Sequence, residues 1–166
     1  RNFRALVFSA PDDCDLLNAD NWTQTNKLDY DPAWPGGGWL EGNIVIDPGG
    51  NVLDILRVEV RRGDRAAIAH VSSDTKTFTF NQRDFIDFPG GGTKFTIRYD
   101  PVSKRYWALV NKQKNPSAER NILVLTSSAN LRDWTVERTI FQNPDEHYVA
   151  WQYVDWLFDG PDIVAV

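Results

Sequence analysis

The sequence lacks most of the features that mark cross-linked, membrane-spanning or helical proteins. It has a single cysteine, Cys14, so no disulfide can form within the chain, and it has no methionine. No apolar run approaches the roughly 20 residues that span a membrane, and no stretch shows helical periodicity. No histidine, cysteine or carboxylate spacing indicates a metal site. We therefore expect no metal, no cofactor and no membrane partner.

Basic charge is also scarce. The 166 residues contain 18 Lys and Arg against 23 Asp and Glu, which gives a net charge of −5. This balance argues against a nucleic-acid partner. Aromatic residues are abundant instead, with seven Trp, nine Phe and five Tyr. Such residues favour β-sheet surfaces, and exposed rings can also stack on sugars.

A repeat organises the chain. The stretch "LTSSANLRDWT" reads as a strand, a polar turn and a new strand that begins near Trp134. An equivalent stretch, "VSSDTKTFT", places Phe78 56 residues earlier, and a further 56 residues back lies Trp22. We interpret the aromatic residue as a packing element under the turn.

A second pattern has a similar period. "NIVIDPGGNVLDILRV", "FTIRYDPVSKRYWALV" and "DWLFDGPDIVAV" each read as strand, tight turn and strand, with turn aspartates at Asp47, Asp100 and Asp159. The repeating unit is therefore about 55 residues of four strands. We call these strands A, B, C and D in chain order.

Four-stranded repeats of this size are typical of β-propeller blades. The sequence predicts an all-β propeller segment, with residues 1–166 in one domain and about three blades centred near Trp22, Phe78 and Trp134. Along the chain, the strands are read in the order C-D, then A-B-C-D twice, then A-B. Both ends are thus cut within a blade, and we expect the missing blades to come from a longer chain or a second copy.

The serine turns "SSDTKTF" and "SSANLRDW" resemble Asp-box (BNR) repeats of sialidase-like propellers. The phrases "GWLEGNIVI", "FPGGGTKFTIRYDP", "RYWALVNKQ" and "AWQYVDWLFDG" are similar to bacterial BNR-repeat proteins described as sialidases or glycosyl hydrolases. The resemblance implies a six-bladed propeller that acts as a sialidase-like glycoside hydrolase on a glycan bound in an axial pocket. It also implies an extracytoplasmic, secreted or periplasmic, protein. Two alternatives remain open: a non-catalytic propeller that binds glycan or protein, and a furanosidase-type propeller hydrolase.

The candidate site follows from the A strands. Counting back from each turn aspartate, one strand face carries polar residues near its start: Glu41 and Asn43, Lys94 and Thr96, and Tyr153 and Asp155. A glycosidase needs two carboxyl groups, and sialidases use a tyrosine nucleophile. The catalytic candidates are therefore Glu41, Asp155 and Tyr153.

The loops and flanking residues supply candidates for substrate binding. Arginines can clamp a carboxylate, and tryptophans near the A strands can stack on a sugar ring. The candidates are Trp39, Asn43, Arg61, Lys94, Lys112, Gln113 and Gln152.

We expect the two acids, Glu41 and Asp155, to converge on one pocket, because they lie at matched depths on A strands two blades apart. One of them should have a raised pKa if it serves as a general acid. The alternative interpretation is structural: these residues would form hydrogen bonds between blades and line a water-filled channel.

Overall fold

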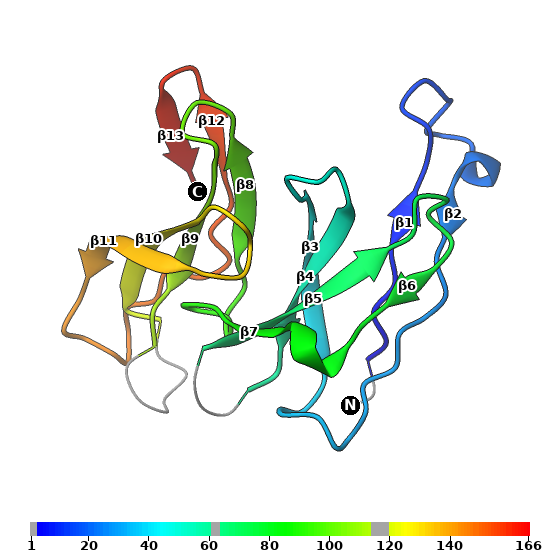
Figure 1. Cartoon of the computed structure of the whole chain (residues 1–166). Helices are drawn as coiled ribbons and strands as arrows, with labels where there is room; N and C mark the ends of the chain where they lie inside the picture. The colour runs from blue at the N-terminus through cyan, green and yellow to red at the C-terminus, as the bar shows by residue number, and fades with distance from the viewer. Residues whose placement is uncertain (1–2, 61–63, 114–119) are drawn as a thin grey trace.

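The computed structural model describes residues 3–60, 64–113 and 120–166, which form antiparallel β-sheets with almost no helix (Figure 1). Within these ranges the only helical segments are two single 3₁₀ turns, Ala19–Asn21 and Gln82–Asp84. The prediction of an all-β fold is confirmed.

The strands form four sheets, and each sheet is built from strands that follow one another in the chain. The first sheet pairs β1 (Phe8–Ser9) with β2 (Thr23–Gln24). The second sheet contains β3 (Trp39–Ile46), β4 (Val52–Val58), β5 (Arg65–Val71), β6 (Phe78–Thr79) and β7 (Phe85–Asp87). The third sheet contains β8 (Thr96–Asp100), β9 (Arg105–Asn111), β10 (Ile122–Ser128) and β11 (Thr135–Gln142). The fourth pairs β12 (Trp156–Asp159) with β13 (Asp162–Ala165).

All strand pairings within these sheets are antiparallel, and they follow the expected strand order. In the second sheet, however, the expected D strand is divided: β6 and β7 both pair with β5, and the 3₁₀ turn Gln82–Asp84 lies between them. Sequence reasoning did not predict this division. In Figure 1 the first sheet lies at one end of the molecule, and β12 and β13 lie beside β8 at the other.

Apolar side chains fill the space between each sheet and the next. The largest cluster joins the second and third sheets and includes Ile55, Ile68, Phe88, Phe95, Tyr106 and Val124. A second cluster joins the first and second sheets and includes Ala5, Trp39, Leu56 and Val58. A third joins the last two sheets through Leu109, Leu123, Val154 and Trp156. Burial of these faces is the main force that holds the sheets together.

The two matching serine turns of the repeat share one backbone conformation. Thr75 and Leu131, which are 56 residues apart, both adopt a left-handed backbone with φ of 56° and 65°. Just before them, Asp74 and Asn130 each accept a hydrogen bond from the backbone N–H two residues further on, at 3.1 and 2.9 Å. These side-chain contacts hold the turn in a conformation that residues other than glycine rarely adopt.

The aromatic residues after the turns pack in three different ways. Trp134 donates its indole N–H to the carbonyl of Leu131 in its own turn, at 2.9 Å. Trp22 donates to Leu16 at 3.0 Å but remains 45% exposed, whereas Phe78 is 1% exposed. The tryptophans therefore fix their own loops, and the phenylalanine is a core residue.

The hairpin aspartates also have a structural role. Asp47 accepts the backbone N–H of Gly49 and that of Asn51, both at 2.8 Å, and Asp100 accepts the hydroxyl of Ser103 at 2.6 Å. Hydrogen bonds from Asn51 and from Ser103 are the main causes that lower the pKa of Asp47 and of Asp100, respectively. Both carboxylates therefore stabilise their own turns.

Candidate ligand-binding site

Two strands, β3 and β8, and the segments that precede β8 and β12 line a polar hollow of about 420 Å³. We call it the polar hollow. Its lining residues are Asn43, Ile44, Lys94, Thr96, Ile97, Arg98, Tyr153 and Asp155. Four of the predicted site residues thus come together there: Asn43, Lys94, Tyr153 and Asp155.

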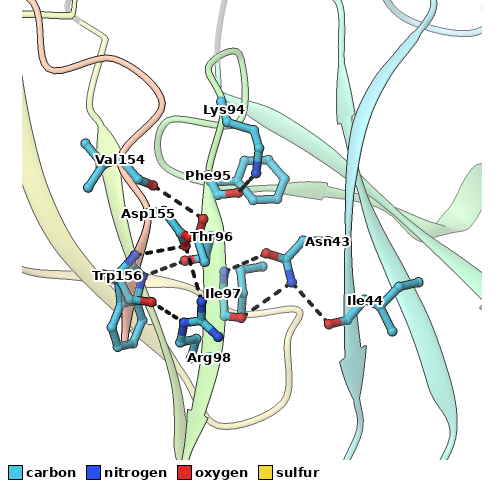
Figure 2. Close-up of polar contacts among 10 residues, drawn as sticks. All are labelled: Asn43, Ile44, Lys94, Phe95, Thr96, Ile97, Arg98, Val154, Asp155 and Trp156. Atoms are coloured by element: carbon cyan, nitrogen blue, oxygen red, sulfur yellow. Dashed lines mark hydrogen bonds and ion pairs between the residues drawn. The ribbon is translucent and has the colours of Figure 1, made fainter. Parts of the chain in front are cut away.

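Two of the lining residues bridge neighbouring strands. The side-chain oxygen of Asn43 accepts the backbone N–H of Ile97 at 2.8 Å, and its amide nitrogen lies 3.4 Å from the carbonyl of the same residue (Figure 2). Thr96, at the equivalent position of the next repeat, donates to the carbonyl of Val154 at 3.3 Å. These bonds connect β3 to β8, and β8 to the segment just before β12, and so shape the hollow.

Asp155 is held by donors on both sides. Its carboxylate accepts the backbone N–H of Trp156 at 2.9 Å and lies 3.2 Å from the guanidinium of Arg98, which also donates to the Trp156 carbonyl (Figure 2). The Trp156 N–H first, and then the Thr96 hydroxyl and Arg98, keep the pKa of Asp155 below its usual value. Asp155 is therefore an anion at neutral pH, which is the opposite of what a general acid needs.

Glu41 has a different environment. Its carboxylate pairs with the guanidinium of Arg57 at 2.9 Å, and Arg57 also donates to the carbonyl of Gly92 at 3.1 Å. Among the described residues that line the polar hollow, Glu41 is absent. This hollow therefore does not bring Glu41 and Asp155 together as expected, because Arg57 holds Glu41 toward the loop that precedes β8.

Tyr153 and Lys94 face the polar hollow from the segments that precede β12 and β8. Tyr153 has a left-handed backbone with φ of 56°, its side chain is exposed, and the guanidinium of Arg120 lies 5.7 Å from its ring centre. Such a conformation in a bulky residue is uncommon and occurs more often at functional sites. Lys94 donates to the carbonyl of Phe95 at 2.8 Å, so its ammonium lies close to the backbone (Figure 2).

The remaining predicted residues lie elsewhere. Trp39 is fully buried among Tyr30, Trp34, Phe80 and Phe85, so a packing role replaces the predicted stacking on a sugar. Gln152 accepts a hydrogen bond from Arg120, and Gln113 lies beside Gly92. The positive charge of Lys112 opposes the rise in the pKa of Asp64 that burial causes. Arg61 falls outside the described residues.

A second, more apolar hollow of about 750 Å³ adjoins the polar one. The two share Ile44, Ile97 and Arg98. The walls of the second hollow also include Ile46, Tyr99, Tyr106, Leu157 and Phe158. A ligand in the polar hollow would thus have apolar and aromatic surface beside it.

Sequence reasoning missed Arg98, which is central to the site. A signal was present: Arg98 lies two residues before Asp100, in the same strand phase as Lys94 and Thr96. It also missed Asp54, a buried acid on β4 that lines a separate hollow.

No family model matches this sequence, and no curated protein matches it. Within the part of the chain that the structure describes, no group of three or more histidine, cysteine, aspartate or glutamate side chains could hold a metal ion. No helix in that part is long and apolar enough to cross a membrane.

Proposed function

We propose that this chain is a segment of a β-propeller and that its polar hollow binds carbohydrate. The propeller proposal is supported by the order of the four sheets, which reads C-D, A-B-C-D, A-B-C-D and A-B. It is also supported by the apolar layer between each sheet and the next, because blades stack face to face in this way. In this proposal β3, β8 and β12 are the innermost strands.

One observation carries the binding proposal: β3, β8 and the segments that precede β8 and β12 bring amide, ammonium, guanidinium, phenol and carboxylate groups to one hollow. A sugar presents hydroxyl groups that both donate and accept, and such a mixed set of partners matches them. The exposed ring of Tyr153 and the adjoining apolar walls offer surface for the C–H face of a sugar. We propose no metal or other cofactor for this site.

Hydrolysis of the glycan is the second candidate function. It is favoured by the position of Tyr153, whose phenol shares the hollow with the anionic Asp155, since sialidase-like enzymes use a tyrosine nucleophile. In this role Asp155 would stabilise positive charge or accept a proton. The proton donor would have to be another group, contributed from outside the polar hollow.

The resemblance to BNR-repeat proteins leads us to infer the remaining properties. These are an extracytoplasmic location, a glycan as the partner, and further blades supplied by a longer chain or a second copy.

Calorimetric titration of the 166-residue protein with a panel of methyl and 4-nitrophenyl glycosides tests the binding proposal. We expect saturable binding of at least one sugar, weakened about tenfold or more by Tyr153→Ala and by Asp155→Asn. Glu41→Gln is the matched control and should leave the affinity within about twofold. Binding that is unaffected by both hollow variants would contradict the proposal.

Release of 4-nitrophenol from the same panel tests hydrolysis. We expect Tyr153→Phe to lower any measured rate about a hundredfold or more while binding persists, because the phenol oxygen is the proposed nucleophile. A rate that survives this change would leave carbohydrate binding as the function of the hollow.

A further inference from the structure

Asp54 stands out among the charged residues of the core. It lies on β4 and is 4% exposed, and its Oδ1 atom has no hydrogen-bond partner among the described residues. A buried carboxylate normally has a counter-ion or several donors, because removing the charge from water is costly. Burial raises the pKa of Asp54 to about 6, although the backbone N–H of Asn43 opposes this shift.

The carboxyl group borders a hollow of about 320 Å³ between the first and second sheets, which we call the Asp54 hollow. Its lining residues are Arg4, Ala5, Leu6, Val7, Phe8, Leu40, Gly42, Ile44, Asp54 and Leu56. Most of this wall is apolar. The other charged residue in it, Arg4, pairs with Asp29 at 3.1 Å.

Gly42 lies directly beside the carboxyl group of Asp54. A Cβ atom at position 42 would lie 2.3 Å from Oδ1 of Asp54, so any other residue would collide with the carboxylate. Gly42 itself is exposed. The glycine therefore leaves a space next to the buried Oδ1 that a side chain at position 42 would fill.

The pair of Gly42 and Asp54 departs from the residue pattern of the repeated hairpins. Ile44 pairs with Asp54 on the neighbouring strand, whereas its counterparts in the next two hairpins, Ile97 and Trp156, pair with Ala108 and Ala165. The counterparts of Gly42 are the apolar residues Phe95 and Val154. Among these three hairpins, only the one in the second sheet has a glycine in place of the larger apolar residue and an acid in place of the alanine.

We propose that the Asp54 hollow binds a primary ammonium group on an apolar stem, with Asp54 as its counter-ion. An ammonium supplies the missing donor to Oδ1 and neutralises the buried charge. The apolar stem packs against Leu40, Ile44 and Leu56. A free alkylamine and the side chain of a lysine in an extended polypeptide both have this chemistry.

Titration of ¹⁵N-labelled protein at pH 7.5, followed by NMR, tests the proposal with n-butylammonium as the probe and n-butanol as the uncharged control. We expect saturable shifts at Gly42, Asp54 and Leu56 with the amine, and at least tenfold weaker binding of the alcohol. Absence of saturable binding, or shifts that map elsewhere, overturns the proposal. This titration uses the unaltered protein, so its outcome does not depend on whether a variant folds.

Asp54→Asn should weaken the binding of n-butylammonium at least tenfold. Asp159→Asn, an exposed change of the same charge, should leave it within about twofold; equal affinity in the two variants overturns the proposal. Two capped tripeptides, Val-Lys-Val and Val-norleucine-Val, distinguish the sources of the amine. Tighter binding of the lysine peptide than of n-butylammonium assigns the hollow to a polypeptide lysine, and the reverse order assigns it to a free amine.

Discussion

At the scale of single residues, the acids of this protein fall into two groups. The exposed aspartates of the turns and of the polar hollow accept hydrogen bonds from nearby donors, which stabilise the anion and lower the pKa, as in Asp155 and Asp100. Asp54 is buried without such donors on Oδ1, and its pKa is raised. Burial first, and then the presence of donors, decides which of these carboxyl groups can hold a proton near neutral pH.

Asp54 makes a specific prediction about the pH dependence of stability. Its pKa is about 6 in the folded protein and about 3.9 in an unfolded chain. The folded state therefore binds the proton more tightly, and stability is lost as the pH rises through the folded-state value. Relative to Asp54→Asn, the free energy of unfolding of the native protein should fall by about 2 kcal/mol between pH 4.5 and pH 7.5.

Urea unfolding of both proteins at the two pH values measures this difference. The comparison cancels the opposite contributions of Asp47, Asp74, Asp100 and Asp155, whose lowered pKa values are common to the two proteins. A difference that does not change with pH would show that Asp54 is not a buried, weakly partnered acid.

At the scale of elements, one strand position links neighbouring sheets. Asn43 on β3 hydrogen-bonds to the backbone of β8, and Thr96 on β8 hydrogen-bonds to the backbone of Val154, just before β12. Asp155 occupies the same position in the third copy and contacts Arg98 and the N–H of Trp156. The polar face of each inner strand therefore has a structural function in addition to any contact with ligand.

Removal of one such hydrogen bond between strands should lower the free energy of unfolding. Asn43→Ala leaves the buried backbone N–H of Ile97 without its partner, so we expect a loss of about 1–3 kcal/mol in the free energy of unfolding. Gln142→Ala, a change at an exposed position of β11, should cost less than about 1 kcal/mol. Chemical denaturation of the two variants checks this, and equal losses would contradict the bridging role of Asn43.

Local patterns in the sequence were enough to predict the order of the strands, because the turn residues Asp47 and Asp100 and the serine turns recur at similar spacings. They did not predict the division of one D strand into β6 and β7. The contacts of side chains were harder to predict. Trp39 is buried by rings from three separate segments, and Glu41 is bound by Arg57, a partner on another strand. Such partners depend on tertiary packing, which a single sequence does not reveal.

At the scale of the whole molecule, stability should differ between the middle and the ends. β10 lies between two strands of its sheet and is almost entirely buried, whereas β13 pairs only with β12 among the described residues and is exposed along its length. Two-stranded sheets are marginally stable. The amides of β13 should therefore exchange with solvent at least about tenfold faster than those of β10.

Hydrogen–deuterium exchange followed by NMR measures these rates residue by residue. β9, which also lies between two strands, serves as the internal control and should match β10. Protection of β13 equal to that of β10 would show that the last hairpin is covered by contacts that the 166-residue structure does not contain.

The central claim is that the polar hollow between β3, β8 and β12 binds carbohydrate. The most direct measurement is an NMR titration of the ¹⁵N-labelled protein with the sugar that binds best in calorimetry. We predict saturable shifts at Asn43, Lys94, Tyr153 and Asp155, with the serine turn at Thr75 unchanged. Shifts confined to surfaces away from these residues, or no saturable shift with any sugar of the panel, would contradict the account.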